Sequence, residues 1–518
     1  TKAAKIFSCS FTGLKCQIIE VEADISSGLP NFSIVGLGDA SVQESRERVR
    51  SSIKNSGAEF PQNRKTINLA PAEVRKQGSL FDLPIALSIL LATEQVNSSK
   101  VANSIIIGEL SLSGEIKKIQ GALPLTQHAK NKGFKKIFLP AENAIEASFI
   151  KDIEIYPLTS LKQFIDFCNN HIVIEPMAHN SVQDFDKNNS NDDYNLYNII
   201  GLEKEKRALS IAAAGGHSVL LIGPPGTGKT ILARCFGQLL PKMSSSEILE
   251  TTKIFSIAGL LEHTSPLVSK RPFREVHHTA SLVAVIGGGM HNPSPGEISL
   301  AHNGVLFFDE IAEFPQKTLE ALRQPLEDKF INISRANFFV RFPSNFIFLA
   351  TMNPCPCGYN GDSKVRCICQ PHQIENYKKK LSGPILDRFD IFLQVPLLPM
   401  KDIFAVGHSN QKESIIKPIN QAASIQSERF KELNNIRKNA DMTLDEIKKF
   451  CDLSPEARNT LKEAVESMHI SNRGYLKLIK ISRTIADLEL SPNVKSSHVA
   501  EALQYRKEEF FNKRLVTS

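Results

Sequence analysis

Residues 219–233 read VLLIGPPGTGKTILA, and this stretch decides how the middle of the chain folds. An apolar run is followed by GPPGTGKT, which satisfies the pattern G-x-x-x-x-G-K-[ST], and then by residues with a helical pattern. In a strand, loop and helix of this order, backbone N–H groups and the positive end of the helix converge on an anion. We therefore predict a phosphate-binding loop rather than a chance glycine-rich turn.

The loop assigns roles to individual side chains. Lys229 is expected to reach the β- and γ-phosphate oxygens and Thr230 to bind Mg²⁺, so ATP and Mg²⁺ are the predicted cofactors. The residues predicted to contact the nucleotide or its metal are Gly223, Pro224, Pro225, Gly226, Thr227, Gly228, Lys229, Thr230 and Asp309.

Two later apolar runs carry polar residues at their ends. GVLFFDE (304–310) ends on Asp309 and Glu310, and FIFLATMNP (346–354) carries Asn353. As buried strands of one parallel sheet, both runs bring these side chains to the edge where α/β proteins bind ligands. Asp309 is predicted to hold Mg²⁺ through water, and Glu310 to polarise the attacking water. Asn353 either holds that water and senses the γ-phosphate, or only caps its strand.

Composition excludes several classes of protein. The chain has 518 residues, 42% of them hydrophobic and 23% charged, which is typical of a soluble protein with several domains. No apolar run reaches the roughly 18–20 residues of a membrane span, and the start lacks the apolar core of a signal peptide. Nine cysteines in so long a chain are not a secreted disulfide framework, so we expect a cytoplasmic protein. The net charge of +7 permits an anionic partner without requiring one.

The pattern along the chain predicts three structured parts and a linker. Residues 171–197 are rich in Asn, Asp and Ser and lack hydrophobic periodicity, as linkers do. Residues 1–170 mix short apolar runs with helical stretches, which predicts an α+β domain. Over 198–400, buried strands alternate with helices, which predicts a parallel sheet covered on both faces. Residues 401–518 are predicted to form a helical lid, with helices at 419–439, 443–451, 454–469, 473–488 and 496–510.

Several runs resemble a known family. GPPGTGKT, GVLFFDE, ATMNPCPCG and LSGPILDRFD resemble the magnesium-chelatase-like group of AAA+ ATPases. RPFREVHHTAS, GGGMHNPSPGEISLAHNGVLFFDE and LEALRQPLED are similar to the ComM (YifB) family, and this resemblance covers nearly the whole chain. It implies a homo-hexameric ring with Asn353 as sensor 1 and Arg473 as sensor 2. It also implies that Arg388, in LDRFD, is an arginine finger for the neighbouring subunit. With Glu310, these are the predicted catalytic residues. A surface ion pair is the alternative for either arginine, and the acids Asp387 and Asp390 beside Arg388 favour that alternative there on sequence alone.

The same resemblance indicates what ATP hydrolysis moves. LEDKFINISRANFFVRFPSNFIFLA reads as a strand, a turn and a strand, and is similar to the presensor 1 hairpin of this clade. Residues 281–300 are rich in Gly and Pro, read as a loop, and match the insert in the second core helix. In related ring motors both elements face the central pore. Lys329, Arg335 and Arg341 are therefore candidate DNA contacts. Phe338 and Phe339 either stack on bases or, as we favour, lie in the core.

Four of the cysteines form a cluster in the sequence. Cys355, Cys357, Cys367 and Cys369 have the spacing C-x-C, nine residues, C-x-C. Four thiolates suit tetrahedral Zn²⁺, so we favour a structural zinc, although the spacing departs from the usual C-x-x-C. Four free thiols or a redox pair are the alternatives, and His372 could replace one ligand.

The first domain is similar to the proteolytic domain of Lon protease. RKQGSLFDLPIAL, GELSLSGEIKKIQGALP and KKIFLPAEN carry this resemblance. The positions of the family's nucleophilic Ser and its Lys fall on Leu80 and Leu123, and neither side chain can attack a peptide or accept a proton. The sequence therefore argues against peptidase activity. It does not exclude it fully, because a serine and two lysines lie close to the expected positions: Ser79, Lys117 and Lys118.

Three functions follow from these patterns. The resemblance implies a DNA motor that drives branch migration of recombination junctions, as in natural transformation. The partners that it implies are single-stranded and branched DNA and a recombinase. The alternatives are a remodelling ATPase that acts on a protein partner, as in magnesium chelatase, and an ATP-dependent protease. We favour the DNA motor, because the first alternative normally lacks both the Lon-like domain and the cysteine loop.

Overall fold

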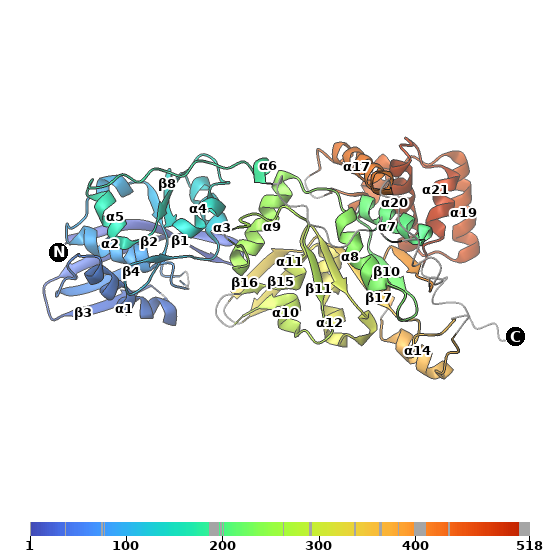
Figure 1. The fold of residues 1–518 in the computed structure, drawn as a ribbon, viewed down its shortest axis with the longest axis horizontal. Helices are drawn as coiled ribbons and strands as arrows, with labels where there is room; N and C mark the ends of the chain where they lie inside the picture. The colour runs from blue at the N-terminus through green and yellow to red at the C-terminus, as the bar shows by residue number, and fades with distance from the viewer. Residues whose placement is uncertain are drawn as a thin grey trace.

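The protein is described by a computed structural model that covers residues 2–36, 38–73, 76, 78–185, 196, 199, 201–262, 264–289, 293–335, 338–361, 365–381, 383–397, 411–433 and 436–506. The N-terminal domain, the nucleotide-binding core and the C-terminal helices follow one another along the long axis of the molecule (Figure 1). Within the part of the chain described, no helix is both long and apolar enough to cross a membrane.

The N-terminal domain is built on a seven-stranded mixed sheet with the order β3-β4-β2-β1-β5-β8-β9. Its strands are β1 (Lys2–Thr12), β2 (Lys15–Ser26), β3 (Asn31–Val35), β4 (Arg64–Ala70), β5 (Ser104–Ile106), β8 (Lys136–Pro140) and β9 (Glu154–Leu158). A second, two-stranded ladder pairs β6 (Glu109–Leu110) with β7 (Ile116–Lys117). Its helices are α1 (Ala40–Asn55), α2 (Asp82–Ala92), α3 (Ala122–Asn131), α4 (Ala141–Ala147) and α5 (Leu161–Cys168). Helix α2 is buried over almost its whole length, which explains its uninterrupted apolar sequence.

The nucleotide-binding core contains a five-stranded parallel sheet with the order β11-β14-β17-β10-β18. These strands are β10 (Val219–Ile222), β11 (Phe273–Val276), β14 (Val305–Phe308), β17 (Ile347–Met352) and β18 (Ile391–Gln394). Alternate residues of β10 enter two different apolar clusters, one on each face of the sheet. The α/β parallel sheet predicted from the buried runs is therefore confirmed.

Helices flank this sheet in the order that the sequence pattern indicates. Helix α7 (Glu203–Gly215) precedes β10, and α8 (Lys229–Leu239) and α9 (Ser245–Ala258) follow it. Beyond β14 lie α12 (Gln316–Ala321) and α13 (Arg323–Asp328), and beyond β17 lie α14 (Pro371–Lys379) and α15 (Gly383–Leu386).

Two additions to the core pack against each other. The hairpin of β15 (Phe330–Arg335) and β16 (Phe338–Pro343) has the predicted strand-turn-strand form. Residues 281–300 were expected to be a loop, and this expectation is wrong. They form α10 (Leu282–Ile286), the short strands β12 (Gly287–Gly288) and β13 (Ser294–Pro295), and α11 (Glu297–Leu300). A Cβ added at Gly287 would lie 3.0 Å from Cδ1 of Ile333, so the insert and the hairpin are in direct contact.

The C-terminal part is helical, as predicted. It consists of α17 (Gln411–Arg429), a short 3₁₀ turn at Asn439–Asp441, α18 (Leu444–Phe450), α19 (Pro455–Met468), α20 (Asn472–Leu488) and α21 (Ser496–Leu503). The helix expected at 419–439 instead begins at Gln411 and ends at Arg429, with Pro418 in its interior, where a proline usually marks a boundary. Helix α21 ends earlier than expected, and residues 507–510 lie outside the described residues.

Helix α9 joins the N-terminal domain to the core. Ile248 and Ile257 of α9 belong to the apolar cluster of the N-terminal domain. The backbone N–H of Gly121 donates to Ser256 O at 3.1 Å, and Ser256 Oγ donates to the Glu146 carboxylate. The domains therefore share a packed interface, and the short helix α6 (Val182–Phe185), in the segment predicted as a linker, lies beside α9.

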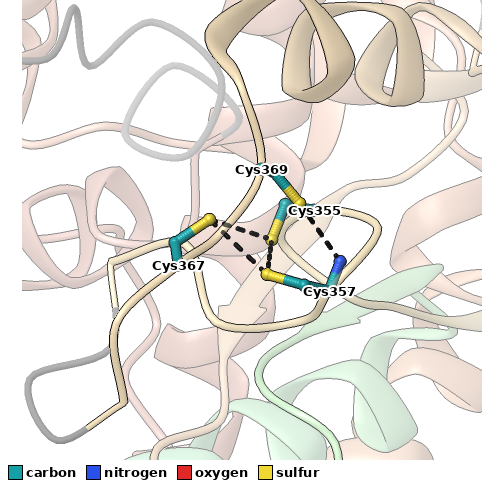
Figure 2. A group of neighbouring side chains, drawn as sticks. All are labelled: Cys355, Cys357, Cys367 and Cys369. Atoms are coloured by element: carbon teal, nitrogen blue, oxygen red, sulfur yellow. Dashed lines mark hydrogen bonds between the residues drawn. The ribbon is translucent and has the colours of Figure 1, made fainter.

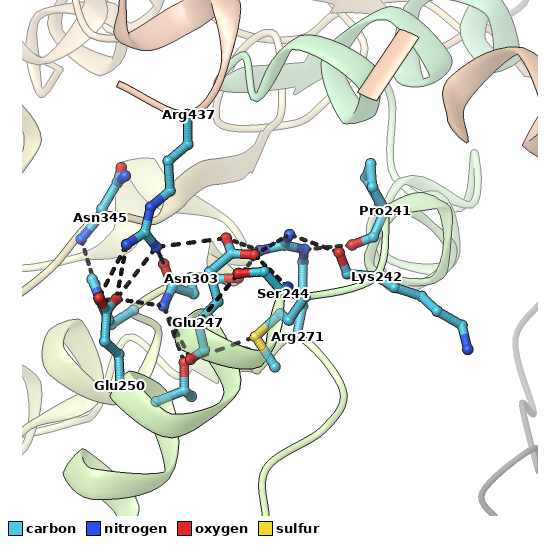
Figure 3. A network of polar contacts seen from close by, with 12 residues as sticks. Pro241, Lys242, Ser244, Glu247, Glu250, Arg271, Asn303, Asn345 and Arg437 are labelled. Carbon is cyan, nitrogen blue, oxygen red and sulfur yellow. Dashed lines mark hydrogen bonds and ion pairs between the residues drawn. The ribbon is translucent and has the colours of Figure 1, made fainter. Parts of the chain in front are cut away.

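A buried ionic network holds the start of α9 against the sheet (Figure 3). The Arg271 and Glu247 side chains are only 7% and 9% exposed, and their closest N–O distance is 3.1 Å. Arg271 also donates to the carbonyls of Pro241 at 2.6 Å and Asn303 at 2.8 Å. Burial acts to raise the pKa of Glu247, but the charge and hydrogen bonds of Arg271 outweigh it and hold that pKa below its ordinary value. Arg437, from the C-terminal part, joins the network at Glu250.

Candidate nucleotide-binding site

The phosphate loop connects β10 to α8. Its Gly226 and Gly228 have φ values of +78° and +82°, a conformation that residues with a Cβ rarely adopt. Lys229 begins α8 and is buried, and its Nζ donates to Gly223 O and Pro224 O, both at 2.8 Å, and to Asn353 Oδ1 at 3.2 Å. Burial lowers the pKa of Lys229, while the nearby carboxylates act in the opposite direction.

The structure brings the predicted Mg²⁺ ligands together. Thr230 Oγ1 donates to Asp309 Oδ2 at 3.0 Å across the gap between α8 and the end of β14. A hydroxyl and a carboxylate at this edge of the sheet fit Mg²⁺, which takes few protein ligands and completes its shell with phosphate oxygens and water. Bound there, the ion would neutralise phosphate charge.

Glu310 is held by its backbone rather than by its side chain. Its φ of +51° lies in the left-handed region, where a non-glycine residue is strained, and such strain is often found at functional sites. Its N–H donates to Thr351 Oγ1 at 2.8 Å, and its side chain is exposed beside Asp309, where water can reach it. Thr351 also donates to Asp309, so it orients both acids. The sequence analysis missed Thr351, although a hydroxyl in an otherwise apolar strand was a usable signal.

Arg388 and Arg473 lie at the opposite edge of the sheet. Strand β18 runs parallel to β10 with Ile391 beside Val219, so Arg388 lies before the amino end of its strand, whereas the phosphate loop follows the carboxyl end of β10. Four strand residues at about 3.3 Å each separate these edges by about 13 Å.

Both arginines share one partner, Glu327 at the end of α13. Arg473 Nη2 lies 3.0 Å from Glu327 Oε1, and Arg388 pairs with the same oxygen. Lys477, one turn after Arg473, donates to Phe389 O at 2.6 Å and so fixes α20 beside Arg388. An ion pair for Arg388 was the expected alternative, but its partner is Glu327 rather than the adjacent acids.

The candidate DNA contacts on the hairpin differ from one another. Lys329 lies at its base, 3.7 Å from Asp441, and is thus turned towards the lid. Arg341 is exposed, donates to Asn332 Oδ1 at 3.1 Å and lies over the Phe330 ring at 4.0 Å. The side chains of Arg335 and Phe338 lie outside the described residues.

The position of Phe339 differs from the one that we expected from the sequence. We favoured the core for this residue, but its side chain is 56% exposed on the hairpin. The insert that packs on the hairpin also exposes the apolar residues Leu282 and Val283. The hairpin and the insert therefore expose neighbouring apolar side chains beside the exposed Arg341.

The four clustered cysteines converge on one point (Figure 2). The distances from Cys355 Sγ are 3.4 Å to Cys357 Sγ and 3.7 Å to Cys367 Sγ, and Cys357 Sγ lies 3.5 Å from Cys367 Sγ. All four sulfurs lie within 4.8 Å of one another, and the group does not include His372. A tetrahedral zinc site with bonds of about 2.3 Å has edges of about 3.8 Å, so the group fits Zn²⁺.

The peptidase residues are not assembled in the N-terminal domain. Leu80 and Leu123 are both buried in its apolar cluster. Ser79 donates to Glu109, Lys117 pairs with Glu115 at 2.5 Å, and Lys118 donates to a main-chain carbonyl of the core. These nearby residues therefore have other partners and do not form a Ser–Lys dyad.

Comparison with known proteins identifies the family of the chain. Residues 195–403 match the family described as "Magnesium chelatase, subunit ChlI", residues 409–506 match its C-terminal family, and residues 21–143 match "Subunit ChlI of Mg-chelatase". The competence protein ComM of Haemophilus influenzae is 39% identical over 505 residues, which cover 97% of each chain. The chain belongs to the ComM family. Protein YifB of Salmonella typhimurium is 40% identical over 95% of each chain.

Membership fixes the general activity of this ComM-family protein. It is a magnesium-chelatase-like AAA+ protein, and the family implies an ATPase that uses ATP and Mg²⁺. The Lon protease 2 of Bacillus subtilis is 31% identical over 153 residues, which cover 27% of this chain. The Lon-like similarity is therefore partial.

Proposed function

We propose that this protein is an ATP-driven DNA motor, active as a homo-hexamer, that promotes branch migration of recombination junctions. The observation that carries the proposal is the separation of the site into two halves. Lys229, Thr230, Asp309 and Glu310 lie at one edge of the sheet, and Arg388 lies at the other with Arg473. A guanidinium that cannot reach its own phosphate loop can serve a second copy, and head-to-tail contacts of this kind close into a ring.

In this arrangement the chain's own residues divide the chemistry. Lys229 binds the phosphates, and Asp309 and Thr230 hold the metal, which supplies charge neutralisation. Glu310 orients the attacking water, and Asn353, held beside Lys229, senses the γ-phosphate. Arg388 and Arg473 act on the neighbour's nucleotide, and Glu327 is the anion that holds them before assembly.

DNA is the proposed partner because of the hairpin and its neighbour. Exposed Phe339 and Arg341 lie on the hairpin, and exposed Leu282 and Val283 lie on the insert packed against it. Stacking and phosphate contacts of this kind bind single strands with little sequence preference. The printed name of the relative from Haemophilus influenzae, a competence protein, favours DNA uptake and recombination as the context. We accordingly place the protein in the cytoplasm, where chromosomal DNA and its recombinases lie.

A second function is favoured by one observation. The matches over 195–403 and 409–506 are to a magnesium chelatase subunit, so a protein partner could replace DNA. ATP turnover with and without forked DNA separates the two, because only the motor is stimulated. Branch migration of a synthetic Holliday or three-strand junction by the purified protein and ATP is the direct test. Failure in both assays would refute the DNA motor.

The cysteine group completes the proposal. We propose that Cys355, Cys357, Cys367 and Cys369 hold one structural Zn²⁺, supported by the spacing of their sulfurs. Exclusion of His372 from the group favours a site of four thiolates over one with a histidine ligand.

A further inference from the structure

The cysteine group lies directly beside the nucleotide site. Asn353, whose side chain accepts from Lys229, precedes Cys355 by two residues. On the other side of the group, α14 begins at Pro371 and carries the buried Tyr377, which lies near Asn353: burial raises the pKa of its hydroxyl, and the backbone of Asn353 acts in the opposite direction. The chain thus leaves Asn353, passes through the four cysteines and returns to Asn353.

Gly358, in the same segment, contacts the phosphate loop. Gly358 has a φ of +88°, and a Cβ added there would lie 2.5 Å from Cδ of Pro225 and 3.1 Å from its Cγ. Its backbone therefore packs against the middle of GPPGTGKT with no room for a side chain. The N–H of Gly358 donates to Cys355 O at 3.0 Å, which ties this contact to the first cysteine.

The conformation of the segment depends on the cysteines. Between Met352 and Pro371 the described residues form no helix or strand, so regular backbone hydrogen bonds do not hold them. The N–H of Cys357 instead donates to Cys369 Sγ at 3.4 Å, and the N–H of Asn360 donates to Cys355 Sγ at 3.3 Å. Four sulfurs this close repel one another as thiolates unless a cation lies between them, and metal binding then stabilises the fold around it.

We propose that a zinc ion in the four-cysteine group positions Asn353 and the phosphate loop, so that nucleotide affinity depends on the metal. The inference rests on the proposed zinc site and adds a role for it. The group lies outside the reacting atoms and acts through Asn353 and Pro225, and its residues are positioning residues. Groups that orient a functional site in this way typically contribute about 10–100-fold to affinity or activity.

The test compares two substitutions of one ligand in the full-length protein. Cys369→Ser removes a ligand, whereas Cys369→His replaces it with another that zinc accepts. Cys16→Ser is the matched control, because Cys16 is also partly buried but lies in β2 of the N-terminal domain. Two quantities are measured without DNA: zinc per chain by mass spectrometry of the metal, and the Kd of a fluorescent ATP analogue with Mg²⁺. Circular dichroism establishes that each variant is folded.

We expect about one zinc per chain in the unsubstituted protein, in Cys369→His and in Cys16→Ser, and a much lower content in Cys369→Ser. We expect the Kd to rise about 10-fold or more only in Cys369→Ser. Absence of zinc from the unsubstituted protein overturns the metal site. Loss of zinc with an unchanged Kd overturns the positioning role.

A second variant tests the contact itself should Cys369→Ser fail to fold. Gly358→Ala places a methyl group against Pro225 and leaves all four ligands in place. We expect zinc content to be retained and the Kd to rise. An unchanged Kd in this variant contradicts the positioning role, because a change at the contact between Gly358 and Pro225 would then have no effect on nucleotide binding. None of these measurements uses DNA, so failure of the proposed motor would leave them unaffected.

Discussion

Mixing two inactive variants tests whether the two halves of the site come from different subunits. Lys229→Ala removes the phosphate-binding lysine, and Arg388→Ala removes the guanidinium at the opposite edge of the sheet. Each variant alone has one defect at every subunit contact. An arginine finger is worth roughly 10³–10⁵ in turnover, so Arg388→Ala is expected to fall below about 0.1% of normal ATPase activity. Lys229→Ala is expected to be at least as inactive.

The geometry sets the recovery expected in the mixture. A working contact needs an intact loop from one chain, supplied by Arg388→Ala, and an intact arginine from the next, supplied by Lys229→Ala. With equal amounts and random assembly, about one half of one half, or roughly a quarter, of the contacts in a ring meet both conditions. The mixture should therefore recover up to about a quarter of normal turnover if the contacts act independently, from two components that have almost none.

The assay is steady-state ATPase at equal total protein, after the variants have exchanged subunits or have been co-expressed. The matched control mixes Lys229→Ala with Glu310→Gln. Both of these defects lie at the phosphate-loop edge, so every contact keeps one of them and no recovery is expected. Activity of Arg388→Ala alone near the normal level, or the absence of recovery in mixed rings shown by size to have assembled, would refute the division of the site between subunits.

Three further predictions address single side chains. Glu310→Gln should bind ATP normally in a filter or fluorescence assay but turn over at least about 100-fold more slowly, and near-normal turnover contradicts the role of Glu310 in polarising water. Arg271→Ala leaves the buried Glu247 with only the more distant Arg437, at 3.8 Å, as an ion-pair partner and should cost up to about 3 kcal/mol of stability. The urea midpoint in circular dichroism should fall accordingly, whereas the half-exposed control Arg323→Ala should shift it little. Arg271 holds the pKa of Glu247 below its ordinary 4.5, so the ion pair stabilises the fold above pH 4.5 and loses this effect as the pH falls below it. The difference in stability between the unsubstituted protein and Arg271→Ala should therefore become smaller in acid, and a difference that does not change with pH contradicts the pairing. Phe339→Ala should weaken the binding of single-stranded DNA, measured by fluorescence anisotropy, by about 1–3 kcal/mol without changing nucleotide affinity. Unchanged DNA binding would contradict a contact between Phe339 and DNA.

The parts of the site that the sequence predicts are those built from local chain geometry. A strand, a glycine loop and a helix place Lys229 and Thr230, and an apolar strand ending in two acids places Asp309 and Glu310. Such residues depend on neighbours only a few positions away and on the edge at which parallel strands end. The α/β architecture is predictable for the same reason, because an apolar run in the sequence indicates each buried strand.

The parts that it does not predict depend on distant contacts. Glu327 holds both Arg388 and Arg473, yet nothing in the local pattern of α13 links it to the turn before β18 or to α20. Phe339 is exposed because the hairpin extends away from its neighbours, and an aromatic pair in a strand gives no sign of this. The described residues of 281–300 form short helices and strands where the insert packs on the hairpin, despite a Gly- and Pro-rich composition that indicates a loop.

The position of the N-terminal domain gives a physical reason for its retention without peptidase residues. A Cβ added at Gly13, in the turn between β1 and β2, would lie 2.1 Å from Cγ1 of Val340, so this turn packs against β16 of the core hairpin (Figure 1). Since side chains alternate along a strand, Val340 faces this support and Phe339 faces outward. Removal of the domain would expose Val340 together with Ile248 of α9, both of which are buried. The domain thus supports one face of the hairpin through Val340 of β16 and leaves the face that carries Phe339 exposed, and this support depends on the shape of the domain rather than on peptidase chemistry.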